Sequence, residues 1–351
     1  MTDMFEQVRE KVLCEFSGLE NANIAPLGHG LINQTFLLTT DRERFVLQRL
    51  AALFAPEINH NIAAVTQALD SAGLPTPRLL ATREGKLWVD LGASGVWRAQ
   101  TFVAGHGFDK VQSPAQARSA SELVARFHRA VDQLDHRFVG LREGVHDTPK
   151  HLARLREALG AHASHRLFSG VAALAGTIFA SAERLQTLPV LPARIGHGDL
   201  KLNNVLFAGD HAPASEDAVC LIDLDTVGPV LLAHEIGDAW RSWCNPSGED
   251  STQAKVDLAV MAASFDGYAA AIGRLLTKDE RLALLGGVEW ISLELASRFA
   301  TDALNENYFG WDPGRYATRG EHNLVRARGQ FALHEALLVC RGERRKLLGL
   351  A

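Results

Sequence analysis

Apolar residues are spaced along the chain in two ways, and the change between them separates a strand-rich part from a helix-rich part. In roughly the first hundred residues, short apolar runs alternate with glycine, proline and polar turns, which is typical of β-strands. Beyond them, apolar positions recur every three or four residues over longer stretches, as in amphipathic helices. We therefore expect an α+β protein whose sheet is formed near the N-terminus.

The same patterns predict the individual elements. Strands are expected within residues 24–40, 44–50, 87–90 and 96–103. Helices are expected at 4–18, 59–72, 121–134, twice within 150–187, and at 255–275 and 278–305. Two short buried strands, 205–207 and 218–222, interrupt the helical part.

Polar residues gather around these two short strands at fixed intervals. Residues 195–207 read IGHGDLKLNNVLF, so Asn204 follows Asp199 by five positions, and Asp223 comes directly after the second apolar run. Enzymes that transfer phosphoryl groups use an aspartate, an asparagine five residues later and a strand-end aspartate in this order. Each residue alone is compatible with ordinary loop chemistry, but the joint pattern is much less expected by chance.

The predicted roles follow from this layout. Asp199 would receive the proton of the attacking hydroxyl, and Lys201 would neutralise the phosphoryl group during transfer. Asn204 and Asp223 are the predicted ligands of Mg²⁺, which would hold the phosphates of ATP. Asp225 is either a further carboxylate for the metal or the substrate, or a turn residue.

Four passages of the sequence resemble the superfamily of aminoglycoside phosphotransferases and choline kinases, which are relatives of the protein kinases. They are GHGLINQT at 28–35, KLNN at 201–204, IDLDT at 222–226 and EHNLVR at 321–326. The last is narrower and is most similar to bacterial N-acetylhexosamine 1-kinases. The resemblance implies a two-lobed, protein-kinase-like fold. A small N-terminal β-sheet lobe would cover residues 1–103, and a larger, mainly helical lobe with the catalytic loop and acceptor site would cover residues 104–351.

The resemblance also implies an activity, the transfer of the γ-phosphoryl group of ATP to the anomeric hydroxyl of an N-acetylhexosamine. Arg298 and Tyr308 match positions that line the sugar pocket in those kinases. From the residues alone, Glu294, Arg298 and Asp302 could equally form a solvated stripe of ion pairs on one helix face. Asp238 is expected to begin a helix that braces the catalytic loop.

The nucleotide is expected between the lobes. Gly28 and Gly30 lie in the turn between the first two strands, where backbone N–H groups can approach phosphate oxygens. By resemblance, Gln100 and Phe102 lie near the hinge that borders the adenine.

The third strand departs from the protein-kinase pattern. Gln48 and Arg49 stand where a phosphate-binding lysine is expected. Either Arg49 or a distant cation must compensate for the uncharged Gln48, or nucleotide affinity is weaker. A solvated cation at the strand edge is the alternative interpretation of Arg49.

Composition narrows the class of protein. The chain has 351 residues, is 47% hydrophobic and carries a formal charge of −5, which gives no indication of nucleic-acid binding. The four cysteines lack a C-x-x-C spacing, which favours free thiols in a reducing cytosol. No apolar run reaches the ~18 residues of a membrane span, and the N-terminus lacks a signal core. A cytoplasmic protein without a membrane or nucleic-acid partner is therefore expected.

Two alternatives remain open. One is a kinase for another small alcohol, such as an aminoglycoside, choline or homoserine. Residues 294–351 contain seven acidic and nine basic residues, which does not favour a polycationic aminoglycoside. The other is a nucleotide-binding pseudokinase, which only the missing strand lysine suggests.

Overall fold

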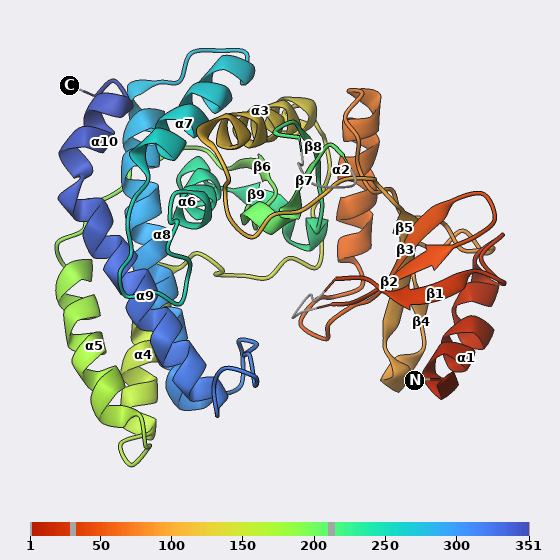
Figure 1. The fold of residues 1–351 in the computed structure, drawn as a ribbon, viewed down its shortest axis with the longest axis horizontal. Coiled ribbons are helices and arrows are strands. Elements are labelled where there is room, and N and C mark those ends of the chain that lie inside the picture. The colour runs from red at the N-terminus through yellow and green to blue at the C-terminus, as the bar shows by residue number, and fades with distance from the viewer. Residues whose placement is uncertain (1, 29–32, 210–214, 351) are drawn as a thin grey trace.

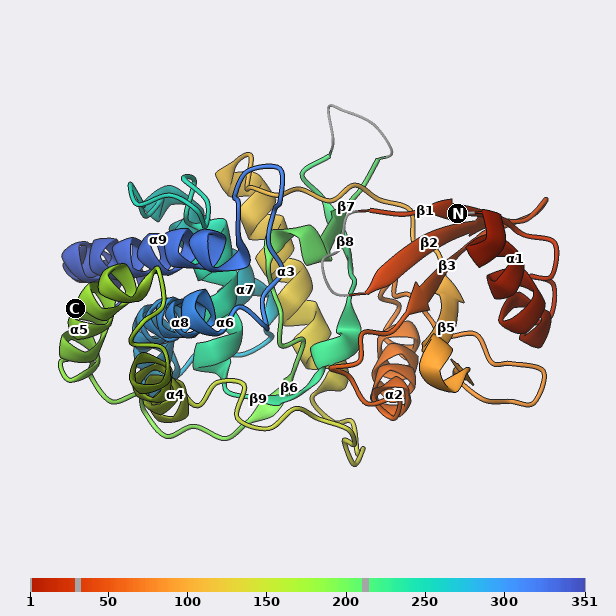
Figure 2. The same cartoon turned by 90° about the horizontal axis from the view of Figure 1, so that it is seen from below.

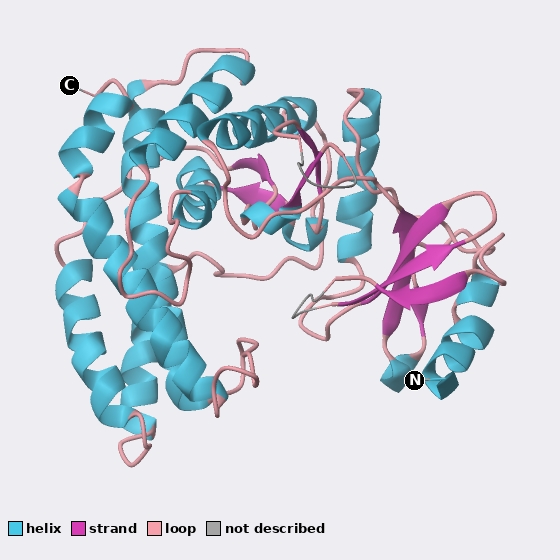
Figure 3. Cartoon of the chain, viewed as in Figure 1, coloured by secondary structure: helices cyan, strands magenta, loops and turns pink. Residues whose placement is uncertain are grey.

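The computed structural model describes residues 2–28, 33–209 and 215–350, and it consists of a sheet-containing N-terminal lobe and a larger helical lobe (Figures 1 and 3). This arrangement confirms the expected α+β fold. Within the described part of the chain, no helix is both long and apolar enough to cross a membrane.

The N-terminal lobe is built on a five-stranded antiparallel sheet with the strand order β1-β2-β3-β5-β4. Its strands are β1 (Asn23–Pro26), β2 (Gln34–Thr39), β3 (Arg44–Arg49), β4 (Val89–Asp90) and β5 (Val96–Thr101). Successive side chains point to opposite faces, and Phe36, Leu47 and Trp97 bury one face in an apolar core. All the strands expected in this part of the chain are present.

The apolar face is covered by the N-terminal helix α1 (Thr2–Lys11) and a short 3-10 turn, η1 (Leu13–Glu15). The sequence pattern predicted one helix over residues 4–18, but the α-helix ends at Lys11. The apolar spacing continues through the 3-10 turn, which explains why the pattern looked like a single helix.

Helix α2 (Ile58–Ser71) lies between the sheet and the helical lobe (Figures 1 and 2). On one side its Asn59 contacts Arg98 of β5, and on the other the helix contacts α3 and the 3-10 turn η4 (Leu224–Thr226). Gly73, with a φ of 71°, follows the end of the helix as predicted. The helix therefore contacts both the sheet of the small lobe and the helical lobe.

The helical lobe is organised around α8 (Lys278–Asn305), which is buried over most of its length. Helices α4, α5, α6 and α9 contact it. The other helices are α3 (Pro114–Val131), α4 (Thr148–Ala161), α5 (Phe168–Ala182), α6 (Leu232–Trp243), α7 (Leu258–Ala271), α9 (Arg319–Val339) and α10 (Arg341–Leu347). Helix α3 begins before the predicted residue 121 because the Ser113 side chain caps it ahead of Pro114.

Two pairs of short strands lie on the side of the helical lobe that faces the small lobe (Figure 1). β6 (Arg194–Gly196) pairs with β9 (Gly228–Val230), and β7 (Val205–Phe207) pairs with β8 (Ala218–Leu221). The two predicted short strands are confirmed as β7 and β8. The polar loops that connect these strands are therefore presented toward the small lobe.

Helices α6 and α8 cross so closely that their backbones are in contact. A Cβ atom on Gly237 of α6 would lie 2.8 Å from the carbonyl carbon of Gly287 of α8. Any side chain at either glycine would push the helices apart, so the crossing requires glycine on both sides. As a result, α6 has one fixed position against the central helix.

Glu280, in the first turn of α8, generates a prediction for stability. Its carboxylate accepts hydrogen bonds from the guanidinium of Arg274, from Arg194 Nη2 at 2.9 Å and from the backbone N–H of Thr277. The bonds from Arg274 are the largest effect, and they lower the pKa of Glu280 to about 2 from 4.5 despite its burial. The ionised form therefore stabilises the fold above about pH 4.5, and this contribution is lost as the pH falls toward 2.

We expect Glu280→Gln to lower the free energy of unfolding by about 1–3 kcal/mol at neutral pH. Urea unfolding of both proteins at a series of pH values measures the difference, which should shrink below pH 4.5. Glu84→Gln, which removes the exposed Glu84–Lys86 pair, is the control and should have little effect. A difference between wild type and Glu280→Gln that stayed constant down to pH 2.5 would contradict the prediction.

Candidate active site

The loop of residues 197–204 joins β6 to β7 and brings three of the predicted residues together. Lys201 Nζ donates to Asp199 Oδ2 over 2.7 Å. Asn204 Nδ2 donates to the same oxygen over 3.2 Å and to the Asp199 carbonyl over 2.9 Å. Burial lowers the pKa of Lys201, but the carboxylates of Asp199 and Asp223 outweigh it and hold that pKa above its ordinary value. Lys201 is therefore a cation shared by two carboxylates.

Asp223, the fourth predicted residue, follows the last residue of β8 by two positions. Its φ is 65°, a left-handed conformation that costs energy in a residue other than glycine. The N–H of Ile222 donates to the carbonyl of Asn204 over 2.9 Å, which ties the strand end to the loop. Burial, followed by the neighbouring Asp225 carboxylate, raises the pKa of Asp223 to about 6. This carboxylate lacks sufficient positive charge around it, which is the condition that a bound cation would relieve.

The available donors fit a magnesium ion that is bound together with phosphates. Among the described residues, no cluster of three or more His, Cys, Asp or Glu side chains could hold a metal alone. Mg²⁺ in nucleotide sites usually takes one or two carboxylates, and phosphate oxygens and water complete its shell. The Asp223 carboxylate and the side-chain oxygen of Asn204 supply donors of this kind.

Glu235, in α6, fixes the backbone at the start of the 197–204 loop. Its two carboxylate oxygens accept the backbone N–H groups of His197, at 2.8 Å, and Gly198, at 2.9 Å. His128 Nε2 lies 3.2 Å from the first of these oxygens. Burial raises the pKa of Glu235, but the hydrogen bond and charge of His128 outweigh it, so that the pKa lies below its ordinary value. Glu235 is therefore an ionised, buried anchor for the loop.

Asp238 was expected from the sequence to begin this helix and to brace the loop, and the expected helix start was wrong. Asp238 lies inside α6 rather than at its start, and its Oδ1 accepts from Arg241 Nη2 over 2.8 Å. Glu235 reaches the loop across 38 residues, so no local pattern of the sequence indicated its role.

Gly198 makes the turn that delivers Asp199. Its φ is 81°, and a Cβ atom there would lie 2.6 Å from the carbonyl oxygen of Thr226. The hydroxyl of Thr226 donates to the carbonyl of His197 over 2.8 Å, and His197 Nε2 lies 2.8 Å from the carbonyl of Ile222. The loop and the segment after β8 therefore hold each other in place.

On the small lobe, the residues predicted to meet the nucleotide fall on both faces of the sheet. Gln48 and Gln100 lie on the face toward α2, where Gln100 Nε2 donates to Gln48 Oε1 over 3.2 Å. Arg49 pairs in register with Trp97 on the opposite, core-facing side, and its side chain lies against Gly95. The described structure thus brings Gln48, but not Arg49, to the face toward the helical lobe.

Two further predicted nucleotide residues, Gly28 and Phe102, lie just beyond the ends of strands. Gly28 has a φ of 73°, consistent with a tight turn after β1, while Gly30 lies outside the described residues. Phe102 follows β5, and the guanidinium of Arg44 lies 4.2 Å from the centroid of its ring.

On the helical lobe, Arg298 and Tyr308 line one cavity of about 310 Å³. Arg298 Nη1 lies 3.7 Å from Glu294 Oε1, and the Tyr308 hydroxyl accepts from Arg142 Nη2 over 2.6 Å. Glu294 is buried, so these residues do not form the solvated stripe that was the alternative interpretation. The structure brings both predicted acceptor residues to one cavity.

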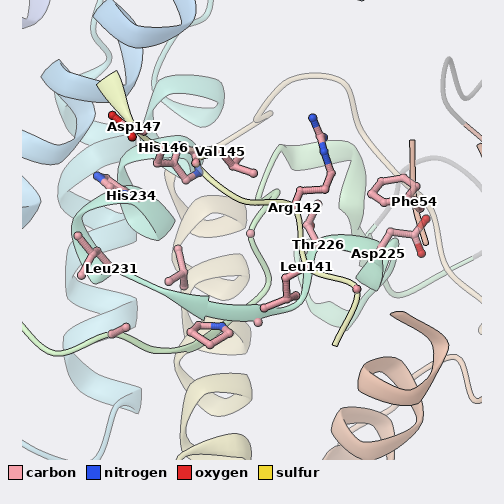
Figure 4. A pocket seen from close by; sticks show the side chains of 17 residues that line it. Phe54, Leu141, Arg142, Val145, His146, Asp147, Asp225, Thr226, Leu231 and His234 are labelled. Atoms are coloured by element: carbon pink, nitrogen blue, oxygen red, sulfur yellow. The ribbon is translucent and has the colours of Figure 1, made fainter. Parts of the chain in front are cut away.

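Asp225 lies in a second cavity of about 300 Å³, which shares Arg142, Gly144 and Val145 with the first. Figure 4 shows Asp225 and Thr226 near one end of it, and His146 and His234 toward the other. Burial, followed by the charge of His146, lowers the pKa of His234 to about 4. This cavity reaches Gly198 and thus the 197–204 loop.

The passage at 321–326 anchors the loop of residues 307–318, which carries Tyr308. Asn323 Nδ2 donates to Asp302 Oδ2 over 2.8 Å, and the Asp302 carboxylate also accepts the N–H groups of residues 307–309. Arg326 Nη1 donates to the carbonyl of Gly310 over 3.2 Å. Asp302 is therefore occupied as a loop anchor, which sequence spacing could not show because its partners are backbone groups.

The chain is similar to known proteins in both family and fold. A family model described as "Phosphotransferase enzyme family" matches residues 23–273. A microcompartment-associated aminopropanol kinase is 18% identical, with a TM-score of 0.64 and 97% of this chain and 99% of that chain covered. A choline kinase from Cryptosporidium parvum Iowa II is 11% identical, with a TM-score of 0.56 and coverages of 100% and 98%. A spectinomycin phosphotransferase in complex with ADP and spectinomycin is 13% identical, with a TM-score of 0.58 and coverages of 94% and 98%. At such identities the likeness establishes the fold.

The anchoring of the loop by Glu235 generates a second prediction. Glu235→Gln keeps the size of the side chain but replaces one acceptor oxygen with an NH₂ group, which cannot accept from a backbone N–H. We expect phosphotransfer to fall by roughly tenfold or more, because one charge-assisted hydrogen bond is worth about 1.5–3 kcal/mol. Steady-state rates and hydrogen exchange at His197 and Gly198 test this. Glu122→Gln, on the exposed face of α3, is the control, and unchanged exchange at both amides in Glu235→Gln would remove Glu235 as the anchor.

Proposed function

The chain belongs to the phosphotransferase enzyme family, and from that premise we propose that it transfers the γ-phosphoryl group of ATP to the anomeric hydroxyl of an N-acetylhexosamine. The observation that carries the proposal is the cluster of Asp199, Lys201, Asn204 and Asp223, held together at one end of the gap between the lobes. This set provides a base, a cation and two metal donors, which are the parts that phosphoryl transfer requires.

Asp199 is the residue that we assign to the acceptor hydroxyl. Lys201 and Asn204 both donate to its Oδ2, which fixes the carboxylate and leaves Oδ1 to receive the proton. Lys201 also lies close enough to Asp223 for each to affect the charge of the other. It is therefore placed to offset negative charge that develops on the transferred group.

Asn204 and Asp223 would hold Mg²⁺, which supplies charge neutralisation for the phosphates when bound. The chain's own contribution is to fix these donors. The N–H of Ile222 donates to the Asn204 carbonyl, and the left-handed backbone of Asp223 turns its carboxylate toward the loop. The nucleotide would lie along the sheet face of Gln48 and Gln100, with Phe102 near the base.

The acceptor is assigned to the two cavities that share Arg142, Gly144 and Val145. Arg298 and Tyr308 line one of them and are the proposed sugar contacts. Asp225 lies at the other cavity, but its two carboxylate oxygens contact Arg98 and Asn33, so we assign it to holding the site rather than to the sugar. The 321–326 passage supports this assignment because its side chains fix the loop that carries Tyr308. A site of hydroxyl, guanidinium and carboxylate groups suits an acceptor rich in hydroxyl and amide groups.

The charge of the first cavity argues against a cationic acceptor. Three arginines, Arg142, Arg154 and Arg298, line it against two carboxylates, Glu143 and Asp302, and that of Asp302 is already engaged by backbone N–H groups and Asn323. A quaternary or polyamine substrate would meet like charge there, which is unfavourable. An uncharged sugar avoids this repulsion, so we rank choline-like and aminoglycoside acceptors below it.

Asp199→Asn tests the assigned base. We expect ATP binding to change little and turnover to fall by roughly 10²–10⁴-fold, the usual contribution of a positioned general base. Nucleotide titration and initial rates with a saturating sugar measure the two effects. Asp70→Asn, which removes an exposed ion pair with Arg78, is the control, and a fully active Asp199→Asn enzyme would exclude Asp199 from the mechanism.

The position of phosphorylation can be tested with a blocked acceptor. The anomeric hydroxyl is more acidic than the other sugar alcohols, and in-line transfer selects the oxygen that points at the phosphorus. In an ATP-consumption assay with Mg²⁺ over a panel of sugars, we expect the 1-O-methyl glycoside of the best substrate to be inert. The product of the free sugar should be an acid-labile 1-phosphate. Phosphorylation of the methyl glycoside, or an acid-stable product, would leave only the broader assignment as a kinase of small alcohols.

A further inference from the structure

Arg98, on β5, is a buried cation at the junction of the two lobes. It is 1% exposed. Its Nε and Nη2 donate to Gln48 Oε1 over 3.0 and 2.7 Å, and its Nη1 donates to Asn59 Oδ1 over 3.2 Å. Nη2 also lies 2.5 Å from Asp225 Oδ1. Side chains from β3, α2 and the segment after β8 therefore converge on one guanidinium.

Stability alone gives a weak reason for this arrangement. Removing two charges from water is costly, and a buried ion pair often stabilises a fold no better than apolar side chains of the same size. Two of the three acceptors of Arg98 are neutral amides, which hold its geometry but do not offset its charge. A cation that is kept in such a place points to a role in the site itself.

The location of Arg98 corresponds to that of the missing strand lysine. Gln48 stands at the lysine position, and Gln48 and Arg98 are directly paired residues of β3 and β5, on the face toward α2. In protein kinases the lysine is held by a side chain from the helix that follows the strand. Here Asn59 of α2 contacts Arg98 in that manner, whereas Arg49 lies on the opposite face.

Through its ion pair with Asp225, Arg98 joins the small lobe to the helical lobe. Asp225 follows Asp223 by two residues and is 5% exposed. Its other oxygen, Oδ2, accepts from Asn33 Nδ2 over 2.6 Å, and Asn33 Oδ1 accepts from the N–H of Ala51. The segment of residues 223–225 is thus fastened to the small lobe through Arg98 and Asn33.

We propose that Arg98 takes the place of the strand lysine: it is the positioning residue whose charge, acting through Asp225, sets the 223–225 segment for the metal-bound nucleotide. This inference rests on the proposed function. Without Arg98, the buried Asp225 carboxylate would have no cation beside it, two residues from Asp223, the proposed ligand of the nucleotide's metal. Gln48 then serves to orient Arg98, which explains why glutamine is suitable at that position.

Relocation of the charge distinguishes this role from a structural one. Arg98→Met removes the cation. Adding Gln48→Lys places a cation on the same face, one strand away, and within reach of Asp225 from a directly paired position. Arg78→Met removes another arginine of the small lobe, whose exposed ion pair with Asp70 is far weaker, and serves as the matched control.

The experiment measures binding of ATP with Mg²⁺ by calorimetry on the full chain, without acceptor, for wild type and each variant. We expect Arg98→Met to weaken binding by about 10–100-fold, Arg98→Met/Gln48→Lys to recover most of it, and Arg78→Met to match wild type. Circular dichroism and thermal unfolding show which variants are folded. If Arg98→Met does not fold, Arg98→Lys and the double variant decide, since both retain the charge and should bind within about tenfold of wild type.

The outcomes separate this inference from the proposed function. Wild-type affinity in a folded Arg98→Met protein would overturn the role of Arg98 and leave the proposed kinase intact. A folded double variant that binds no better than Arg98→Met would also overturn it, because the charge would then have no effect at its new position. A wild-type protein that binds no ATP with Mg²⁺ would overturn the proposed function and this inference together.

Discussion

The contact between the Glu235 carboxylate and the backbone N–H groups of His197 and Gly198 is the constraint from which the site is built. A buried carboxylate is tolerated only where charge-assisted hydrogen bonds replace its lost water, so the loop has little freedom to leave it. Asp199 follows immediately, and its carboxylate then sets Lys201 and Asn204 by direct hydrogen bonds. Because Glu235 fixes one end of the loop, the spacing of Asp199, Lys201 and Asn204 along the chain determines where their side chains lie.

The sequence was sufficient for the fold, and it named residues that the structure brings together on the 197–204 loop, because both depend on local patterns. Strands and helices followed from apolar spacing, and Asp199 and Asn204 are five residues apart on one loop. Glu235 and Arg98 could not be found in this way. Glu235 meets His197 across 38 residues, and a buried arginine within a strand contradicts the usual preference of arginine for the surface. Their partners are brought to them only by tertiary packing, as are the backbone groups that occupy Asp302.

The two sides of the site are constructed differently. The part around the 197–204 loop depends on single buried charges, Glu235 and Arg98, that join separate elements. The part around the cavity of Arg298 includes a loop, residues 307–318, whose base is tied to α8 and α9 by Asp302, Asn323 and Arg326. Exposed positions such as Tyr308 sit on that loop, which is a usual place for residues that determine specificity. Because the ends of the 307–318 loop are held rigidly, its outward side chains can be changed without moving the loop.

The glycine crossing of α6 and α8 has a consequence for how such a protein can change. Glu235 lies on α6 and Arg298 lies on α8, so the contact between Gly237 and Gly287 fixes the spacing between the loop that Glu235 anchors and the cavity that Arg298 lines. That spacing is a property of two backbones without side chains, and it can be altered only by losing the crossing. A substitution in the lining of the cavity therefore changes its chemistry and leaves this spacing in place.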